Sequence, residues 1–230
     1  TEGIFAPWAF YKKDFQEIGG HDPLYAPQSK EDSDIFNRFQ LNGIKFVQTW
    51  EGCVYHMTCR GSRRNTVDKA KNIYEDSPEW LAQNMRSSRN FIRKWGHFVQ
   101  HDSLMKPIIP PKYDIGFIYR HNDINLLSHL EPWCSTIYVD TNLLQKYIQV
   151  EQSNTIINLN DRIKPLDNEK QNQILVEINN NFAQEDFNYI QQLSQILSNS
   201  GEVGEFELGN LHITVLAIDT FENNLIICKK

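Results

Sequence analysis

Four short motifs contain the residues whose types and spacing could carry out chemistry. They are Gly19-Gly20-His21-Asp22, the octapeptide Glu31-Asp32-Ser33-Asp34-Ile35-Phe36-Asn37-Arg38, then Gly43-Ile44-Lys45-Phe46 and Val54-Tyr55-His56. The octapeptide would open a helix, and the backbone N–H groups and dipole of a helix N-terminus keep carboxylates ionised. An ionised Asp32 can accept a proton from a hydroxyl group that lies within about 2.6 to 3.2 Å. The motifs therefore suggest general-base chemistry at Asp32.

The same carboxylates also have a purely structural interpretation. Asp32 stands three residues after Ser29, as in a helix cap, and Asp34 lies one turn before Arg38. An ion pair at that spacing on an exposed helix contributes only about 0.2–0.5 kcal/mol. The octapeptide by itself leaves both interpretations open.

The order of the four motifs resembles the acceptor-binding half of family 2 glycosyltransferases. In that family a glycine-glycine-x-aspartate turn precedes a Glu-Asp-x-Asp-hydrophobic-x-x-Arg helix, and a glycine and a strand ending in histidine follow. The resemblance covers about residues 3–60, and Lys94-Trp95-Gly96 is similar to the family's tail. It implies the C-terminal portion of a GT-A fold and an inverting transfer of sugar from a nucleotide-sugar donor to an acceptor hydroxyl.

The resemblance also implies roles for individual residues. Asp32 would be the general base, and Glu31 would help to hold the acceptor. His56 would complete the coordination of a divalent cation, Mg²⁺ or Mn²⁺, on the nucleotide diphosphate, although a histidine at a strand end is also a common structural residue. The positions matched to acceptor binding are Trp8, Gly20, His21 and Asp22, of which Trp8 could equally be a core residue.

A cluster of basic residues follows the last motif. Arg60, Arg63 and Arg64 could clamp a diphosphate, because guanidinium groups form bidentate bonds to phosphate oxygens. A solvated basic surface is the alternative interpretation of these arginines.

The nucleotide-binding half of the family, with its own Asp-x-Asp motif, would precede this region and is missing here. Asp32-Ser33-Asp34 lies after the Gly-Gly turn, so it corresponds to the acceptor-side motif. We therefore expect the isolated chain to be inactive. The alternative function is a non-catalytic binding or assembly module derived from a glycosyltransferase.

Charge and composition indicate two domains. Residues 1–112 hold 16 basic and 13 acidic residues, a net charge of +3, whereas residues 113–230 hold 7 and 16, a net charge of −9. The proline-rich stretch 106–112 separates them. We expect an acceptor-side domain with a helical tail over 1–107 and an acidic α+β domain over 113–230, so the fold class is α/β to α+β. The overall charge of −6 argues against nucleic-acid binding.

The periodicity of apolar residues predicts the elements that must position these motifs. In the first domain we expect one helix over 12–18, a second from Ser29 to Gly43 and helical structure within 66–98, where Ser77-Pro78 starts a new helix. We also expect strands over 44–47 and 53–56. In the second domain we expect strands over 114–119, 135–139, 173–179, 205–217 and 224–228, and helices over 123–130, 142–152 and 184–199.

The remaining composition places the chain in a broad class. Four dispersed cysteines without a CxxC pair predict free thiols in a reducing compartment. No apolar stretch of about 18 residues is present, so a membrane segment is not expected in this chain and the predicted location is cytoplasmic. A homo-oligomer is compatible with the sequence.

In the second domain, Glu131 to Cys134 and the three histidines His121, His129 and His212 are expected to be core residues.

Overall fold

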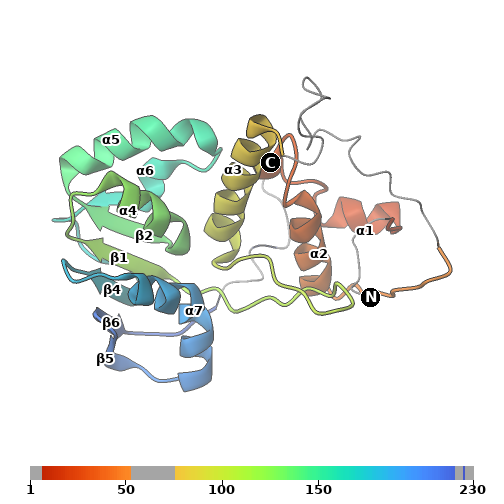
Figure 1. Cartoon of the computed structure of the whole chain (residues 1–230). Coiled ribbons are helices and arrows are strands. Elements are labelled where there is room, and N and C mark those ends of the chain that lie inside the picture. Colours follow the sequence, from red (N-terminus) through yellow and green to blue (C-terminus); the bar gives the residue numbers. More distant parts are fainter. Residues whose placement is uncertain (1–6, 53–75, 221–224, 226–230) are drawn as a thin grey trace. The chain divides into compact units, whose positions relative to one another are not determined.

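A computed structural model describes residues 7–52, 76–220 and 225, and it divides into two compact units (Figure 1). Unit 1 comprises Thr1–Arg89, Val99–Ile108 and Ile226–Lys230, and unit 2 comprises Asn90–Phe98 and Ile109–Leu225. The division falls inside one helix, α3 (Pro78–Trp95). The strands predicted over 53–56 and 224–228, and the helical residues predicted before Asp76, lie almost entirely outside the described residues.

Two helices and the turn between them form the centre of unit 1. The predicted helix at 12–18 is confirmed as α1 (Lys12–Glu17), and the next long helix is α2 (Glu31–Leu41). Gly19 and Gly20 end α1 with φ angles of 84° and 79°, a left-handed conformation that costs glycine little. Between the helices lies the short 3₁₀ helix η1 (Pro23–Tyr25).

One buried apolar cluster of unit 1 joins α1, α2 and the loop after α2. Ile18, Ile35 and Phe39 are fully or almost fully buried, and Trp8, Phe15, Ile44 and Phe46 pack against them. The prediction of a strand over 44–47 is wrong, because these residues form a loop and no described strand pairs with them. The apolar pattern that suggested a strand reflects packing instead, because Ile44 and Phe46 pack against the buried residues of α2. The ring of Phe46 stacks on Phe36 at a centroid distance of 5.0 Å.

The start of α2 differs from the predicted cap. Ser29 and Lys30 adopt φ angles of 81° and 73°, and the N-cap residue is Lys30, without a side-chain cap bond. The Ser29 hydroxyl instead donates to Asn84 Oδ1 of α3 over 2.7 Å. The left-handed backbone at Ser29 and Lys30 turns the hydroxyl away from the helix amides, so the predicted Ser29–Asp32 cap is not formed.

The first part of α3 holds the loop that leads into α2. The helix begins at the predicted Ser77-Pro78 step, where Ser77 Oγ accepts from the Trp80 amide over 3.2 Å. Further along, Gln83 Nε2 donates to the Gln28 carbonyl over 2.9 Å, and Arg86 Nη2 donates to the Ala26 carbonyl over 3.2 Å. These bonds satisfy loop carbonyls that have no partner in regular secondary structure.

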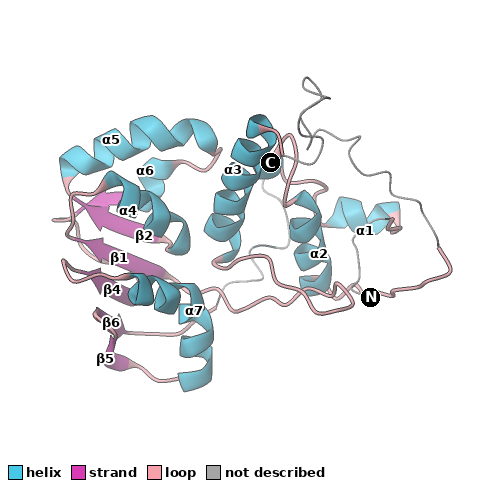
Figure 2. Ribbon diagram, viewed as in Figure 1, coloured by secondary structure: helices cyan, strands magenta, loops and turns pink. Residues whose placement is uncertain are grey.

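Unit 2 is a mixed α/β structure with a six-stranded sheet in the order β3-β2-β1-β4-β6-β5 (Figure 2). The strands are β1 (Ile115–Tyr119), β2 (Thr136–Val139), β3 (Ile163–Pro165), β4 (Ile174–Ile178), β5 (Gly204–Leu208) and β6 (Leu211–Val215). β3, β2, β1 and β4 are parallel, and the β5–β6 hairpin joins β4 in antiparallel orientation.

The helices of unit 2 connect these strands. They are α4 (Ile124–Leu130), η2 (Glu131–Trp133), α5 (Thr141–Glu151), η3 (Gln152–Asn154), α6 (Leu159–Arg162) and α7 (Gln184–Ser200). Asp123 and Asp140 cap α4 and α5 by accepting from the amides of Asn125 and Asn142 over 2.8 and 2.9 Å. The predicted strands and helices between residues 114 and 199 are confirmed, and the segment predicted as strand over 205–217 is the β5–β6 hairpin. The elements α6 and β3 were not predicted.

Alternation along the strands divides the sheet into two faces. Phe117, Ile137 and Val176 share one buried cluster with Leu127 of α4, Leu143 of α5 and other helix residues. The helices α4, α5 and α7 therefore cover this face. Gly116, Ile118, Thr136 and Tyr138 have the opposite parity, lie outside that cluster and face the other side of the sheet.

Three smaller expectations can be compared with the described residues. Cys134 is a free, buried thiol, as predicted, whereas Cys53, Cys59 and Cys228 lie outside them. His129 is exposed and His212 is about one-third exposed, so neither is the core residue that was expected. Across 7–52 and 76–220, no helix has the length and hydropathy required to span a bilayer.

Candidate functional site

A buried arginine ties the Gly-Gly turn to α2. Arg38 donates from Nε to Asp34 Oδ2 over 2.7 Å, from Nη1 to the Ile18 carbonyl over 2.8 Å and from Nη2 to the Gly20 carbonyl over 2.7 Å. The Tyr25 hydroxyl adds a bond of 3.3 Å to Asp34. The predicted Asp34–Arg38 pair is thus confirmed, but it is fully buried and organises the turn, which an exposed helix pair would not do.

The turn and the helix start bring His21 and Asp32 into electrostatic contact. Asp32 is about half-buried, and burial raises the pKa of its carboxyl, while the positive charge of His21 acts in the opposite direction and lowers it. A carboxylate with a raised pKa is a stronger proton acceptor than an exposed aspartate. The arrangement at the start of α2 is consistent with a general base that stays accessible to ligand.

Glu31 contributes a second carboxylate at the same helix start. Its Oε2 atom is buried and has no hydrogen-bond partner among the described residues. An unpaired carboxylate oxygen that has lost water is costly. The start of α2 therefore contains a buried polar atom whose loss of water is not compensated by a described residue.

The other residues matched to acceptor binding have varied surroundings. Trp8 is half-buried and stacks on Phe10 at 4.6 Å, and it also contacts Phe36 at 5.3 Å. Since Phe10 is 42% exposed, Trp8 borders an exposed aromatic surface. The Asp22 carboxylate caps η1 by accepting from the Leu24 amide over 2.9 Å, so it has a structural role in the turn.

The predicted residues for phosphate and metal lie outside the described residues. These are His56, Arg60, Arg63 and Arg64. Within residues 7–52 and 76–220, no group of three or more His, Cys, Asp and Glu side chains is arranged to hold a metal ion.

Unit 2 contains a second concentration of charge, which is buried. Arg93 Nη2 and Arg162 Nε donate to the two oxygens of Glu131 over 2.7 and 2.9 Å, and the Tyr147 hydroxyl adds a bond of 3.1 Å. Burial of Glu131 raises the pKa of its carboxyl, but the two arginines outweigh this effect and lower the pKa to about 2. A permanently ionised, fully paired glutamate is suited to anchoring α3 within unit 2, and it is a poor proton shuttle.

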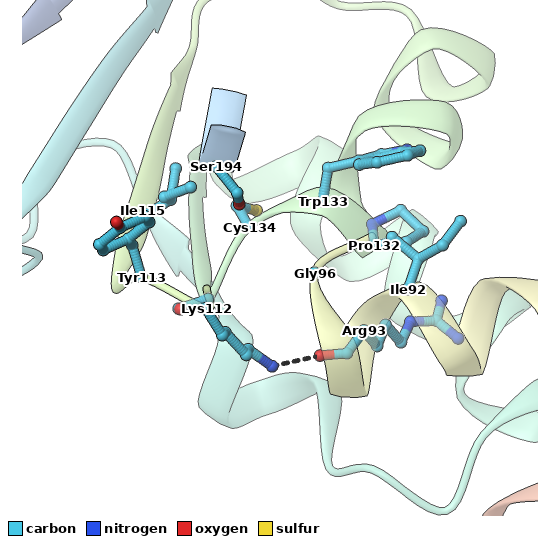
Figure 3. Close-up of a pocket in the computed structure, with 11 residues that line it drawn as sticks. Ile92, Arg93, Gly96, Lys112, Tyr113, Ile115, Pro132, Trp133, Cys134 and Ser194 are labelled. Carbon is cyan, nitrogen blue, oxygen red and sulfur yellow. Dashed lines mark hydrogen bonds between the residues drawn. The ribbon is translucent and has the colours of Figure 1, made fainter. Parts of the chain in front are cut away.

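A small cavity lies beside this charge network (Figure 3). Lys112 points to the end of α3 and donates to the carbonyls of Arg93, over 2.9 Å, and Lys94. Burial, followed by the charges of Arg162 and Lys94, lowers the pKa of Lys112 to about 7. The cavity volume is about 10 Å³, which is close to the minimum for one water molecule. It has no room for a substrate, so Lys112 acts as a cap for the C-terminus of α3.

The strongest candidate site is therefore in unit 1, around the start of α2. There Arg38 binds the Gly20 carbonyl, and the charge of the neighbouring His21 acts on Asp32. Sequence reasoning missed Tyr25 and the Ser29–Asn84 bond, because neither has a recognisable spacing. No protein-family model, curated protein or solved structure matches the chain, so the interpretation of this site rests on its own residues and geometry.

Proposed function

We propose that the site at the start of α2 takes part in the transfer of a sugar from a nucleotide-sugar donor to an acceptor hydroxyl, with Asp32 as the general base. The observation that supports this proposal best is the environment of Asp32. It is half-buried, its pKa is raised by burial, and it faces His21 of a turn that Arg38 fixes. The proposed fold around it is the acceptor-side portion of a GT-A domain.

The proposed step is a single displacement. Asp32 accepts the proton of the acceptor hydroxyl, whose oxygen forms a bond to the anomeric carbon as the bond to the nucleotide diphosphate breaks. The leaving diphosphate takes the bonding electron pair, and the configuration at the anomeric carbon is inverted. Glu31, in the same first turn of α2, would help to hold the acceptor by accepting a hydrogen bond from a second hydroxyl.

The leaving group requires positive charge. Arg60 and Arg63 are the proposed partners of the diphosphate. A divalent cation, Mg²⁺ or Mn²⁺, would neutralise the same charge when bound, with His56 as its proposed protein ligand.

The proposal is tested on the full product of the gene that encodes these residues. Release of nucleoside diphosphate from UDP- and GDP-sugars is measured with a panel of saccharide acceptors, for the unaltered protein and for Asp32→Asn. Loss of a general base should lower kcat by about 10²–10⁴-fold. The matched control is Asp14→Asn, which removes an acidic residue from the first turn of α1 and should leave kcat unchanged.

Two results would reject catalysis at this site. The first is turnover that Asp32→Asn leaves intact. The second is acceptor binding without any turnover, which would support the alternative function of a binding or assembly module.

A further inference from the structure

A polar groove lies in unit 2, on the face of the sheet opposite to α4, α5 and α7. Its volume is about 480 Å³, within the range of about 300–1,000 Å³ that is usual for small-molecule sites. Thr136, Tyr138 and Lys164 come from the strands that floor it, and Asn172 lies at its base. Asp161 of α6 and Glu169 of the loop that leads to β4 also line it, and both are exposed.

The strand register explains why the floor is polar. Gly116 of β1 pairs with Thr136 of β2, and Tyr138 of β2 pairs with Lys164 of β3. Residues at alternate positions share a face. These four residues therefore form one continuous band across three neighbouring strands, on the face that lacks the helix-covered core.

The base of the groove is held by hydrogen bonds around Asn172, which is 5% exposed. Its amide nitrogen donates to Asp114 Oδ1 over 2.6 Å and to Thr136 Oγ1 over 3.3 Å. Its carbonyl oxygen accepts from the Tyr138 hydroxyl over 2.9 Å. Side chains held in this way are oriented before any ligand arrives.

A glycine creates the space for that arrangement. A Cβ atom at position 116 would lie 2.4 Å from Asn172 Oδ1, well inside contact distance. Asn172 can lie flat on β1 only because residue 116 has no side chain. The sequence thus accommodates a buried amide at the base of the groove where an apolar contact would be the simpler solution.

The lining narrows the class of ligand. Asp114, Asp161 and Glu169 supply three carboxylates, against the ammonium groups of Lys164 in the lining and of Lys170 beside Tyr138. The net charge around the groove is therefore negative, which disfavours phosphates and other anions. The ring of Tyr138 is only 3% exposed, and the Lys170 ammonium lies 4.9 Å from its centroid. A nucleobase would therefore find no open ring on which to stack. The carboxylate and amide groups that line the groove each offer two polar atoms, and such pairs of atoms suit neighbouring hydroxyl groups of a ligand.

We propose that this groove binds a neutral polyhydroxylated ligand, namely a saccharide. Glu169 and Asp161 accept hydrogen bonds from hydroxyl groups, and Lys164 donates to a ring or hydroxyl oxygen with protons that its bond to the Asn160 carbonyl does not use. The site is independent of the function proposed for unit 1, because it shares no residue with the surroundings of Asp32.

The test is titration of the whole chain, followed by ¹H–¹⁵N NMR of the backbone amides. The probes are methyl glycosides of glucose, galactose, mannose and N-acetylglucosamine and their disaccharides, with inorganic phosphate and adenosine as representatives of the excluded classes. At least one saccharide is expected to shift the amides of residues 168–172 and Thr136. Glu169→Gln should weaken its binding roughly tenfold, the usual effect of losing a hydrogen bond to a charged group.

Asp167→Asn is the matched control, since Asp167 is exposed on the same loop but does not line the groove. It should leave the saccharide-induced shifts of residues 168–172 unchanged. The proposal is overturned if no saccharide shifts residues 168–172 at millimolar concentration, if phosphate or adenosine binds there instead, or if Asp167→Asn weakens binding as much as Glu169→Gln.

Discussion

The guanidinium of Arg38 lies 2.7 Å from the Asp34 carboxylate, and neither side chain is accessible to solvent. Asp32 precedes Asp34 by two residues on α2, and two residues correspond to roughly 200° around a helix. The two aspartates therefore point in nearly opposite directions. Asp34 faces the interior and binds the arginine that fixes the Gly-Gly turn, whereas Asp32 is only about half-buried.

This relationship predicts that Arg38→Met will destabilise unit 1 strongly. Removing one member of a buried ion pair typically costs about 3–5 kcal/mol, and here two backbone carbonyls lose their donor as well. Arg38→Lys should fail to restore stability, because a single ammonium cannot serve three acceptors in the geometry of a guanidinium. Hydrogen exchange of the α2 amides measures the effect, and exposed Lys45→Met is the control. Unchanged α2 protection in Arg38→Met would contradict this role.

A second prediction concerns the protonation of Asp32. Burial raises the pKa of this carboxyl and the charge of His21 lowers it, so His21→Asn should raise the pKa further. The acid limb of kcat/KM against pH should then move to higher pH, since a larger fraction of Asp32 is protonated at each acidic pH. A ¹³C titration of the Asp32 carboxyl reports the same change without turnover. A lower pKa of the Asp32 carboxyl in His21→Asn would show that the two charges do not interact in this way.

A third prediction is acid destabilisation through His97 of unit 2. Burial, followed by the Lys112 charge, lowers the pKa of the imidazole from 6.5 to about 4 in spite of its bond to the Phe98 carbonyl. The unfolded chain therefore binds this proton between pH 6.5 and 4 and the folded chain does not. The free energy of unfolding should therefore be highest above pH 6.5, as far as His97 determines it, and fall by about 3 kcal/mol as the pH is lowered to 4. His97→Leu should flatten this part of the curve of unfolding free energy against pH, while exposed His129→Gln should not.

A fourth prediction concerns the boundary of unit 2. A fragment of residues 113–230 lacks Arg93, so Glu131 and Glu151 would both lose their ion pairs with its guanidinium. It also lacks Ile92 of the main core. A loss of about 3–5 kcal/mol from the charges alone is a large part of the total stability of a domain, about 5–15 kcal/mol. A fragment of residues 76–230 should unfold cooperatively in urea, and 113–230 should not. Equal cooperativity would show that the end of α3 is dispensable.

Regular periodicity made most of unit 2 predictable from the sequence. The buried strands β1 and β4 are short apolar runs, and α5 and α7 have apolar residues at helical spacing between capping and turn residues. β3 was missed because it has only three residues and ends in a proline. Its place in the sheet depends on pairing with β2, a long-range contact that local pattern does not contain.

Unit 1 was predicted less completely, because its polar contacts are specific to the tertiary structure. The residues around Asp32 could be identified from motif spacing, but Arg38 was interpreted as one half of a helix pair, and its bonds to Ile18 and Gly20 were not foreseen. The Ser29 cap failed because a serine followed by helical residues does not reveal a left-handed backbone. In each case the missing information was a partner distant in the sequence.

Gly116 and Asn172 cannot vary independently during evolution. Any side chain at position 116 would collide with the amide that lies on it, and loss of the amide would leave Asp114 and the Tyr138 hydroxyl without this shared partner. Substitutions at the two positions should therefore occur together in related sequences, even though 55 residues separate them along the chain and neither belongs to the motifs of unit 1. Such a pair is a coevolutionary marker by which distant relatives of unit 2 could be recognised after overall similarity has faded.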